Sequence, residues 1–203
     1  CASSVYIVND CLDLESDRRH PRKRNRPFAS GSLSIPFGLA LAAACLLGGV
    51  LLAFALPRLF LLVLVGYLAL TTAYSFYLKQ FVLLDVIVLA QLYTVRVYGG
   101  GAATDVAPSH WLLTFSLFLF LSLALVKRFT ELRLMSQAEG EGLPGRGYWV
   151  TDVEHISSIG TASGLLAVLV LALYISSKEV LLLYTHADVL WLVCPVMLYW
   201  ISR

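Results

Sequence analysis

Residues 9–31 read NDCLDLESDRRHPRKRNRPFASG, and almost everything after them is apolar. This stretch holds four of the chain's 13 acidic residues and six of its 15 Lys and Arg residues. The 203-residue chain is 59% hydrophobic and only 14% charged, with a mean hydropathy of +0.78, whereas a soluble domain carries about 25% charged residues. The sequence therefore predicts an all-α protein, a polytopic bundle of transmembrane helices with one charged functional site.

The apolar blocks on either side of this stretch predict the helices, because each later block is close to the roughly 20 residues that cross a bilayer. We expect residues 1–17 to be the end of one helix, broken at His20-Pro21 because proline disfavours helix in the residue before it. The other helices are expected at about 33–55, 58–78, 82–103, 110–131, 154–176 and 186–202. The long polar connection between the fourth and fifth of these is 132–153.

Both ends of the chain lie in or beside apolar segments, starting at Cys1 and stopping at Arg203. We therefore expect residues 1–203 to form one transmembrane domain that is truncated at both ends.

The distribution of basic residues predicts an orientation. If the apolar segments alternate across the membrane, most Lys and Arg residues fall on the side of residues 9–31, and the positive-inside bias makes that side cytoplasmic. We expect a multi-pass protein of the inner (plasma) membrane with its active site facing the cytoplasm. The same alternation gathers at one face the residues Asp10, Asp13, Asp17, Lys79, Asp85, Lys127, Arg128, Glu131 and Asp152.

Three carboxylates in the charged stretch suggest a metal site. Asp10, Asp13 and Asp17 are spaced i, i+3, i+7, so on a helix they lie within about 60° of one another around the axis. They repel one another unless a cation lies between them. Oxygen ligands without His or Cys partners suit a hard cation such as Mg²⁺. We predict that these three residues are catalytic and bind the metal.

Basic side chains at the same face predict a phosphate site. Mg²⁺ held by carboxylates usually bridges to substrate phosphates, and the cations that would neutralise the remaining charge are Lys23, Arg26, Lys79, Lys127 and Arg128. Asp85 lies inside the apolar run VLLDVIVLA, where a carboxylate needs a cation or a metal. The expected partners are a diphosphate-bearing donor and membrane lipid. We expect no nucleic-acid partner, and the sequence leaves open whether the protein forms a homo-oligomer. The alternative is a solvated charge run, or a basic loop that binds anionic lipid.

These residues resemble the first signature of the UbiA superfamily of membrane prenyltransferases, N-D-x-x-D-x-x-x-D followed by R-P and a small-small-Gly turn. The signature is present as Asn9-Asp10, Asp13, Asp17, Arg26-Pro27 and Ala29-Ser30-Gly31. The resemblance implies a bundle of nine helices, of which about six to seven would be present here, and a site that opens to the cytoplasm and to lipid.

A narrower resemblance is to the decaprenyl-phosphate phosphoribosyltransferase branch. It is carried by four segments: Asp17 to Pro27, Y-S-F-x-L-K at Tyr74 to Lys79, Arg96 with Gly99-Gly100, and K-R-x-x-E-L at Lys127 to Leu132. It implies Mg²⁺-dependent transfer of a 5-phosphoribosyl group from phosphoribosyl diphosphate to a polyprenyl (decaprenyl) phosphate. The substrate-binding residues would be Asn9, Lys23, Arg26, Tyr74, Lys79, Asp85, Lys127, Arg128 and Asp152.

The second acidic motif of the superfamily, D-x-x-x-D, is not matched in the long connection, which offers only Asp152-x-Glu154. This departure weakens the alternative function, prenyl transfer from a prenyl diphosphate to an aromatic or other small acceptor such as 4-hydroxybenzoate.

Overall fold

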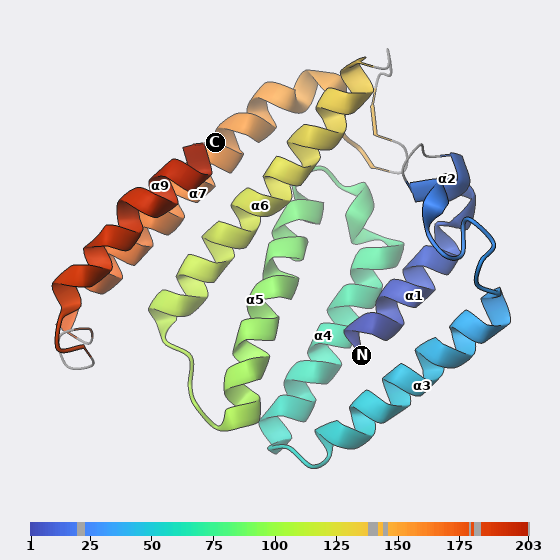
Figure 1. The fold of residues 1–203 in the computed structure, drawn as a ribbon, viewed down its shortest axis with the longest axis horizontal. Helices are drawn as coiled ribbons and strands as arrows, with labels where there is room; N and C mark the ends of the chain where they lie inside the picture. The colour runs from blue at the N-terminus through green and yellow to red at the C-terminus, as the bar shows by residue number, and fades with distance from the viewer. Residues whose placement is uncertain (20–22, 138–141, 144–145, 179, 181–183, 203) are drawn as a thin grey trace. The chain divides into compact units, whose positions relative to one another are not determined.

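The computed structural model describes residues 1–19, 23–137, 142–143, 146–178, 180 and 184–202. Over these ranges the chain is helical and forms no β-strand, apart from one isolated bridge between Gly142 and Trp149. The chain divides into an N-terminal unit, Cys1–Ser75, and a C-terminal unit, Phe76–Arg203, which are described separately. Figure 1 labels the helices of both units.

The N-terminal unit carries the charged stretch between its first helices. Its elements are α1 (Ala2–Leu12), α2 (Leu14–Arg19), the short 3-10 turn η1 (Lys23–Asn25), α3 (Ile35–Ala53) and α4 (Arg58–Phe76). Proline in the first turn of α3 is compatible with a helix start, because the missing N–H would have no partner within the helix there. Helix α1 packs against α3, so the charged residues that follow α1 are anchored to a long apolar helix.

The C-terminal unit is built around three long helices. Its elements are η2 (Leu78–Gln80), α5 (Leu84–Thr104), α6 (His110–Gln137), η3 (Val150–Asp152), α7 (Val153–Ile175), η4 (Ala187–Leu192) and α9 (Val193–Ser202). Helix α6 packs against both α5 and α7. Small residues allow close approach of α6 and α7: the Ser122 hydroxyl donates to the Gly160 carbonyl over 2.8 Å. One buried hydrophobic cluster of this unit comprises Val86, Ala124, Leu125, Leu132, Tyr148 and Ile156.

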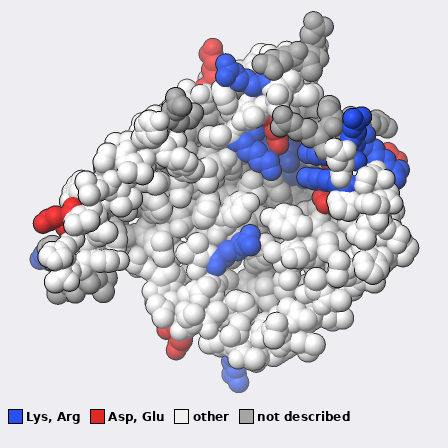
Figure 2. Space-filling view, viewed as in Figure 1, with Lys and Arg blue, Asp and Glu red and all other residues white. Residues whose placement is uncertain are grey.

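Five helices, α3 to α7, are long and apolar enough to cross a membrane, as the apolar blocks predict. Their large apolar side chains are exposed in great number, and most of the surface visible in Figure 2 carries neither basic nor acidic side chains. An apolar exterior of this kind suits lipid rather than water. The all-α membrane fold is therefore confirmed, and the chain is a multi-pass membrane protein.

Two of the expected helices, those over residues 1–17 and 110–131, have different bounds in the structure. The helix expected over residues 1–17 is divided at Asp13, whose φ of −88° and ψ of 10° end α1; aspartate is a poor residue for a helix interior. Helix α6 continues to Gln137 instead of ending near 131, because Glu, Leu, Arg and Met in this segment favour helix. The break at His20-Pro21 lies outside the described residues.

The last apolar segment, expected as one helix over 186–202, is a 3-10 turn followed by a short helix, α9. Pro195 explains the difference, because proline has no N–H to donate and its ring clashes with the carbonyl four residues earlier. An α-helix can therefore contain Pro195 only in its first turn, and α9 begins at Val193.

Candidate functional site

The predicted acidic cluster forms in the N-terminal unit around one arginine. Although Asp13 divides the helix, its N–H donates to the Asn9 carbonyl over 2.9 Å, and the Asp17 N–H donates to the Asp13 carbonyl over 2.8 Å. Helical hydrogen bonding thus continues across the junction and keeps Asp10 and Asp17 on a common side. The Nη1 atom of Arg26 donates to Asp10 Oδ1 and to Asp17 Oδ2, each over 2.8 Å. The Asp17 side chain is 3% exposed and that of Arg26 is 40% exposed.

The loop that carries Arg26 is fixed by the residues after it. The Phe28 ring is buried against Gly38 of α3, where a Cβ atom would lie 2.3 Å from the ring. The Ser30 and Ser32 hydroxyls both donate to the Pro27 carbonyl. Gly31 closes the turn at a φ of 78°, a backbone conformation that favours glycine. Arg26 is therefore held beside the acids by packing on α3 and by a hydrogen-bonded turn.

We expect Gly38→Ala to loosen this loop. The new methyl group would displace the Phe28 ring, and overpacking of this kind typically costs about 1–3 kcal/mol. Thermal unfolding of the detergent-solubilised protein should show the loss. The matched control is Gly48→Ala in the same helix, where a Cβ atom meets nothing within 4 Å and the substitution should be neutral or stabilising. Equal unfolding temperatures for the two variants would contradict the role given to Phe28.

The chemistry of the acidic cluster fits a hard divalent cation. Asp10 and Asp17 offer only oxygen ligands, and both carboxylates already point to one cationic nitrogen, Nη1 of Arg26. Among the described residues, no group of three or more His, Cys, Asp or Glu side chains is arranged to hold a metal by itself. Mg²⁺ bound by one or two carboxylates would complete its shell with water and substrate oxygens.

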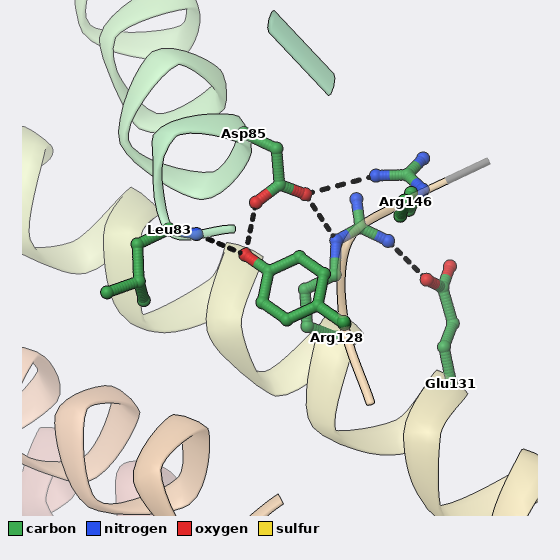
Figure 3. Close-up of polar contacts among 6 residues, drawn as sticks. Leu83, Asp85, Arg128, Glu131 and Arg146 are labelled. Atoms are coloured by element: carbon green, nitrogen blue, oxygen red, sulfur yellow. Dashed lines mark hydrogen bonds and ion pairs between the residues drawn. The ribbon is translucent and has the colours of Figure 1, made fainter. Parts of the chain in front are cut away.

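A second charged cluster lies in the C-terminal unit, around Asp85 in the first turn of α5. Its Oδ2 atom accepts a hydrogen bond from Arg128 Nε over 2.7 Å and another from Arg146 Nη1 over 3.1 Å. Both guanidinium groups turn toward this oxygen (Figure 3). The Oδ1 atom accepts from the Tyr148 hydroxyl, and Arg128 Nη1 also donates to Glu131. The side chains of Asp85 and Arg128 are fully buried, and that of Arg146 is 24% exposed.

Residues far apart in the chain meet at this cluster. The Tyr148 hydroxyl also accepts from the Leu83 N–H over 2.9 Å. Leu83 has a φ of 63°, which is unusual for a leucine and is held by this contact at the start of α5. The Gly147 N–H donates to the Gln80 carbonyl over 3.1 Å. The cluster thus ties residues 146–149 to the N-terminal end of α5 and the C-terminal half of α6.

Tyr148 is held as a neutral hydrogen-bond donor. Burial raises the pKa of its hydroxyl well above the usual value, and the hydrogen bond to the Asp85 carboxylate and its charge raise the pKa further. The hydroxyl therefore keeps its proton throughout the physiological pH range and can bond to Asp85 continuously.

We expect Tyr148→Phe to destabilise the protein by about 1–3 kcal/mol, because it leaves a buried carboxylate oxygen and the Leu83 N–H short of a partner. The ring itself would still fill the core. Thermal unfolding measures the effect, with Tyr199→Phe on the exposed surface of α9 as control. If both substitutions had the same small effect, the hydrogen bonds of Tyr148 would not matter to stability.

The other predicted site residues lie on several elements of the two units. Asn9 lies in α1, Lys23 is exposed in η1, and Tyr74 is half-buried in the last turn of α4. Lys79 lies in η2 before α5, and Lys127 is exposed although its neighbour Arg128 is buried. The Asp152 carboxylate accepts from the Trp149 N–H over 2.9 Å and so caps η3.

Glu131 was expected at the charged face but not as a site residue. Two further residues of the second cluster, Arg146 and Tyr148, were not among the predicted site residues either. Asp85 itself carried the only signal for them, since a carboxylate in an apolar run requires donors from elsewhere in the chain.

Comparison with known proteins finds similar sequences over the whole length of the chain. The model of the UbiA prenyltransferase family matches residues 1–203. The chain is 37% identical over 206 residues to the nodulation protein NoeC of Azorhizobium caulinodans, which covers 100% of this chain and 66% of that protein. It is 37% identical over 203 residues to the uncharacterized protein y4nM of Sinorhizobium fredii, which covers 99% of this chain and 39% of that protein.

A third relative matches a smaller part of the chain more closely. The decaprenyl-phosphate phosphoribosyltransferase of Mycobacterium tuberculosis is 43% identical over 136 residues, which cover 66% of this chain and 44% of that enzyme. The chain therefore spans between 39% and 66% of the length of these three curated relatives.

Proposed function

The chain belongs to the UbiA prenyltransferase family, and on that premise we propose that it transfers a 5-phosphoribosyl group to a polyprenyl phosphate in a Mg²⁺-dependent reaction. The donor would be phosphoribosyl diphosphate and the acceptor a lipid such as decaprenyl phosphate. The observation that carries the proposal is the convergence of the Asp10 and Asp17 carboxylates on one cation beside a basic loop. The choice of donor is supported by the 43% identity to the mycobacterial phosphoribosyltransferase.

The N-terminal unit would bind the diphosphate of the donor. Asp10 and Asp17 would hold Mg²⁺ together with substrate oxygens, and Asp13, at the end of α1, would add a third carboxylate. The metal would neutralise charge on the diphosphate and on the leaving pyrophosphate. Arg26 and Lys23 would bind diphosphate oxygens, since guanidinium and ammonium groups pair strongly with phosphate. Asn9 would add a polar contact from the same helix.

The C-terminal unit would bind phosphate through Lys79 and Lys127 and would position its own loop through the Asp85 cluster. Arg128 is fully buried and paired with Asp85 and Glu131. We therefore propose that it stays in the cluster and positions residues 146–149. The buried Asp85–Arg128 pair is a suitable anchor for this loop, because removal of one partner from a buried ion pair lowers the stability of a protein strongly. Asp152 would be a further substrate-binding residue of this unit, as Tyr74 would be of the N-terminal unit.

The reaction needs no protein nucleophile. An oxygen of the lipid phosphate forms a bond to the anomeric carbon of the ribose, and the bond from that carbon to the diphosphate oxygen breaks. The electron pair leaves with pyrophosphate. The lipid phosphate is already an anion near neutral pH, so the chain's acidic and basic residues act by binding and orienting the two substrates.

The membrane and orientation are also part of the proposal. We propose the inner (plasma) membrane, and the positive-inside bias favours the orientation with the charged stretch on the cytoplasmic side, where a water-soluble donor is available. Labelling single cysteines from each side of intact cells would test the orientation.

The test of function supplies full-length protein in membranes with Mg²⁺, labelled phosphoribosyl diphosphate and polyprenyl phosphate. Label should pass into the lipid extract. The description of the family as prenyltransferases favours a second candidate, prenyl transfer. We take its acceptor to be an aromatic or other small molecule. Prenylation of 4-hydroxybenzoate from a prenyl diphosphate, with no labelled lipid, would replace the first proposal with the second.

A non-catalytic lipid-binding role is tested by the variant with Asp10→Ala and Asp13→Ala. Binding of anionic vesicles through the basic loop would survive loss of these acids, whereas transfer from a Mg²⁺-bound diphosphate would not.

A further inference from the structure

Arg26 occupies the position in which the acidic cluster needs a cation. One nitrogen, Nη1, contacts both Asp10 Oδ1 and Asp17 Oδ2 at 2.8 Å. Asp17 is almost fully buried, whereas the Arg26 side chain is 40% exposed. Two carboxylates that share one partner would repel each other if that partner left and nothing replaced it.

A divalent ion and the Arg26 guanidinium cannot both occupy this position. Mg²⁺ lies at about 2.0–2.1 Å from its oxygen ligands, so a metal bound to Asp10 Oδ1 and Asp17 Oδ2 would displace Arg26 Nη1, which now lies 2.8 Å from both. Two cations between the same carboxylates would also repel each other.

We propose that Arg26 is an exchangeable internal cation, which holds Asp10 and Asp17 in the substrate-free protein and moves to the donor's diphosphate when the metal and the donor bind. The proposal rests on the function proposed above and adds an order of events to it. Metal alone competes with Arg26 and binds weakly. Metal together with a diphosphate binds tightly, because the diphosphate offers the released guanidinium a new anionic partner.

The surroundings of Arg26 suit such an exchange. Its backbone is held by the turn at Pro27 and by the Phe28 ring on Gly38, so only the side chain has to move. That side chain is the most exposed of the three, at 40% against 32% for Asp10 and 3% for Asp17, and the acids that it leaves stay on their helices. Coupling of this kind is reciprocal, so the diphosphate must raise metal affinity by the same factor as the metal raises diphosphate affinity.

The experiment measures Mn²⁺ binding, as a stand-in for Mg²⁺, to the solubilised full-length protein by electron paramagnetic resonance after equilibrium dialysis. Arg26→Gln removes the competing charge, so Mn²⁺ alone should bind about five-fold or more tightly than to wild type, the lower limit of typical coupling between sites. Arg24→Gln in the same loop is the matched control, because Arg24 is exposed in η1. If Arg26→Gln bound Mn²⁺ no more tightly than wild type or Arg24→Gln, the exchange would be refuted.

The effect of pyrophosphate on Mn²⁺ binding gives a second test, which can be read from the wild-type protein alone. Inorganic pyrophosphate, the probe for the donor's diphosphate, should raise its Mn²⁺ affinity, and should do so less in Arg26→Gln. Equal Mn²⁺ affinity of wild type with and without pyrophosphate would also overturn the proposal.

Asp10→Asn separates this proposal from the proposed function. If Asp10→Asn abolishes Mn²⁺ binding while wild type and Arg26→Gln bind equally, the metal site stands and only the exchange fails. If no protein binds Mn²⁺ even with pyrophosphate, the proposed metal site and the exchange fail together.

Discussion

Replacing Asp85 with alanine should lower the free energy of unfolding by about 3–5 kcal/mol, the typical cost of breaking a buried ion pair by removing one partner. Asp85 accepts hydrogen bonds from Arg128, Arg146 and Tyr148. Arg146 can turn toward water because it is partly exposed. Arg128 cannot, because its side chain is fully buried. The cost therefore arises mainly from the guanidinium of Arg128, which loses its partner on α5.

A double variant separates the charge from the packing. Asp85→Leu combined with Arg128→Met removes both charges and keeps apolar volume, and replacing a buried pair in this way is often neutral or stabilising. The double variant should therefore unfold at a higher temperature than Asp85→Ala in detergent. If Asp85→Ala unfolded like wild type, the cluster would not anchor residues 146–149. If the double variant were as unstable as Asp85→Ala, the loss would come from packing instead.

Asp10→Asn should reduce the rate of transfer by a factor of about 10² to 10³, the usual cost of removing one preorganised electrostatic group from an active site. The amide keeps the shape of the side chain and an oxygen that can accept from Arg26, so the fold should be preserved. It removes the negative charge that a divalent cation requires. Initial rates at saturating donor measure the effect.

Glu15→Gln is the matched control for Asp10→Asn. Glu15 is exposed in α2 and falls on roughly the opposite side of the helix from Asp10, so its neutralisation should leave the rate almost unchanged. Equal rates for the two variants would show that Asp10 does not act at the site. Equal thermal unfolding of both variants and wild type would confirm that the rates report on chemistry rather than on folding.

The membrane helices could be predicted from the sequence because length and composition suffice to mark a span. The five helices that can cross a membrane lie where apolar blocks predict them. The placement of Asp10 and Asp17 on one side of a helix could also be predicted, because it follows from the helix period. Arg26 is close to both in the sequence, at most 16 positions away.

The second cluster could be predicted only in part. Asp85 stood out as an acid in an apolar run, but its partners lie 43 to 63 positions away along the chain. Neighbouring Lys127 and Arg128 carry the same charge, and only the packing of α6 against α5 decides that Arg128 is buried. Local patterns contain no information on a contact of this kind, because tertiary packing determines it.

Phosphorus NMR of one reaction mixture tests the central claim most directly. Full-length protein, Mg²⁺, phosphoribosyl diphosphate and polyprenyl phosphate should together produce pyrophosphate and a new lipid phosphodiester in equal amounts, while the lipid phosphomonoester signal falls. Asp10→Asn should leave the starting signals in place. A phosphomonoester signal that stays constant with wild-type protein, while the same preparation releases pyrophosphate from a prenyl diphosphate and an aromatic acceptor, would contradict the account.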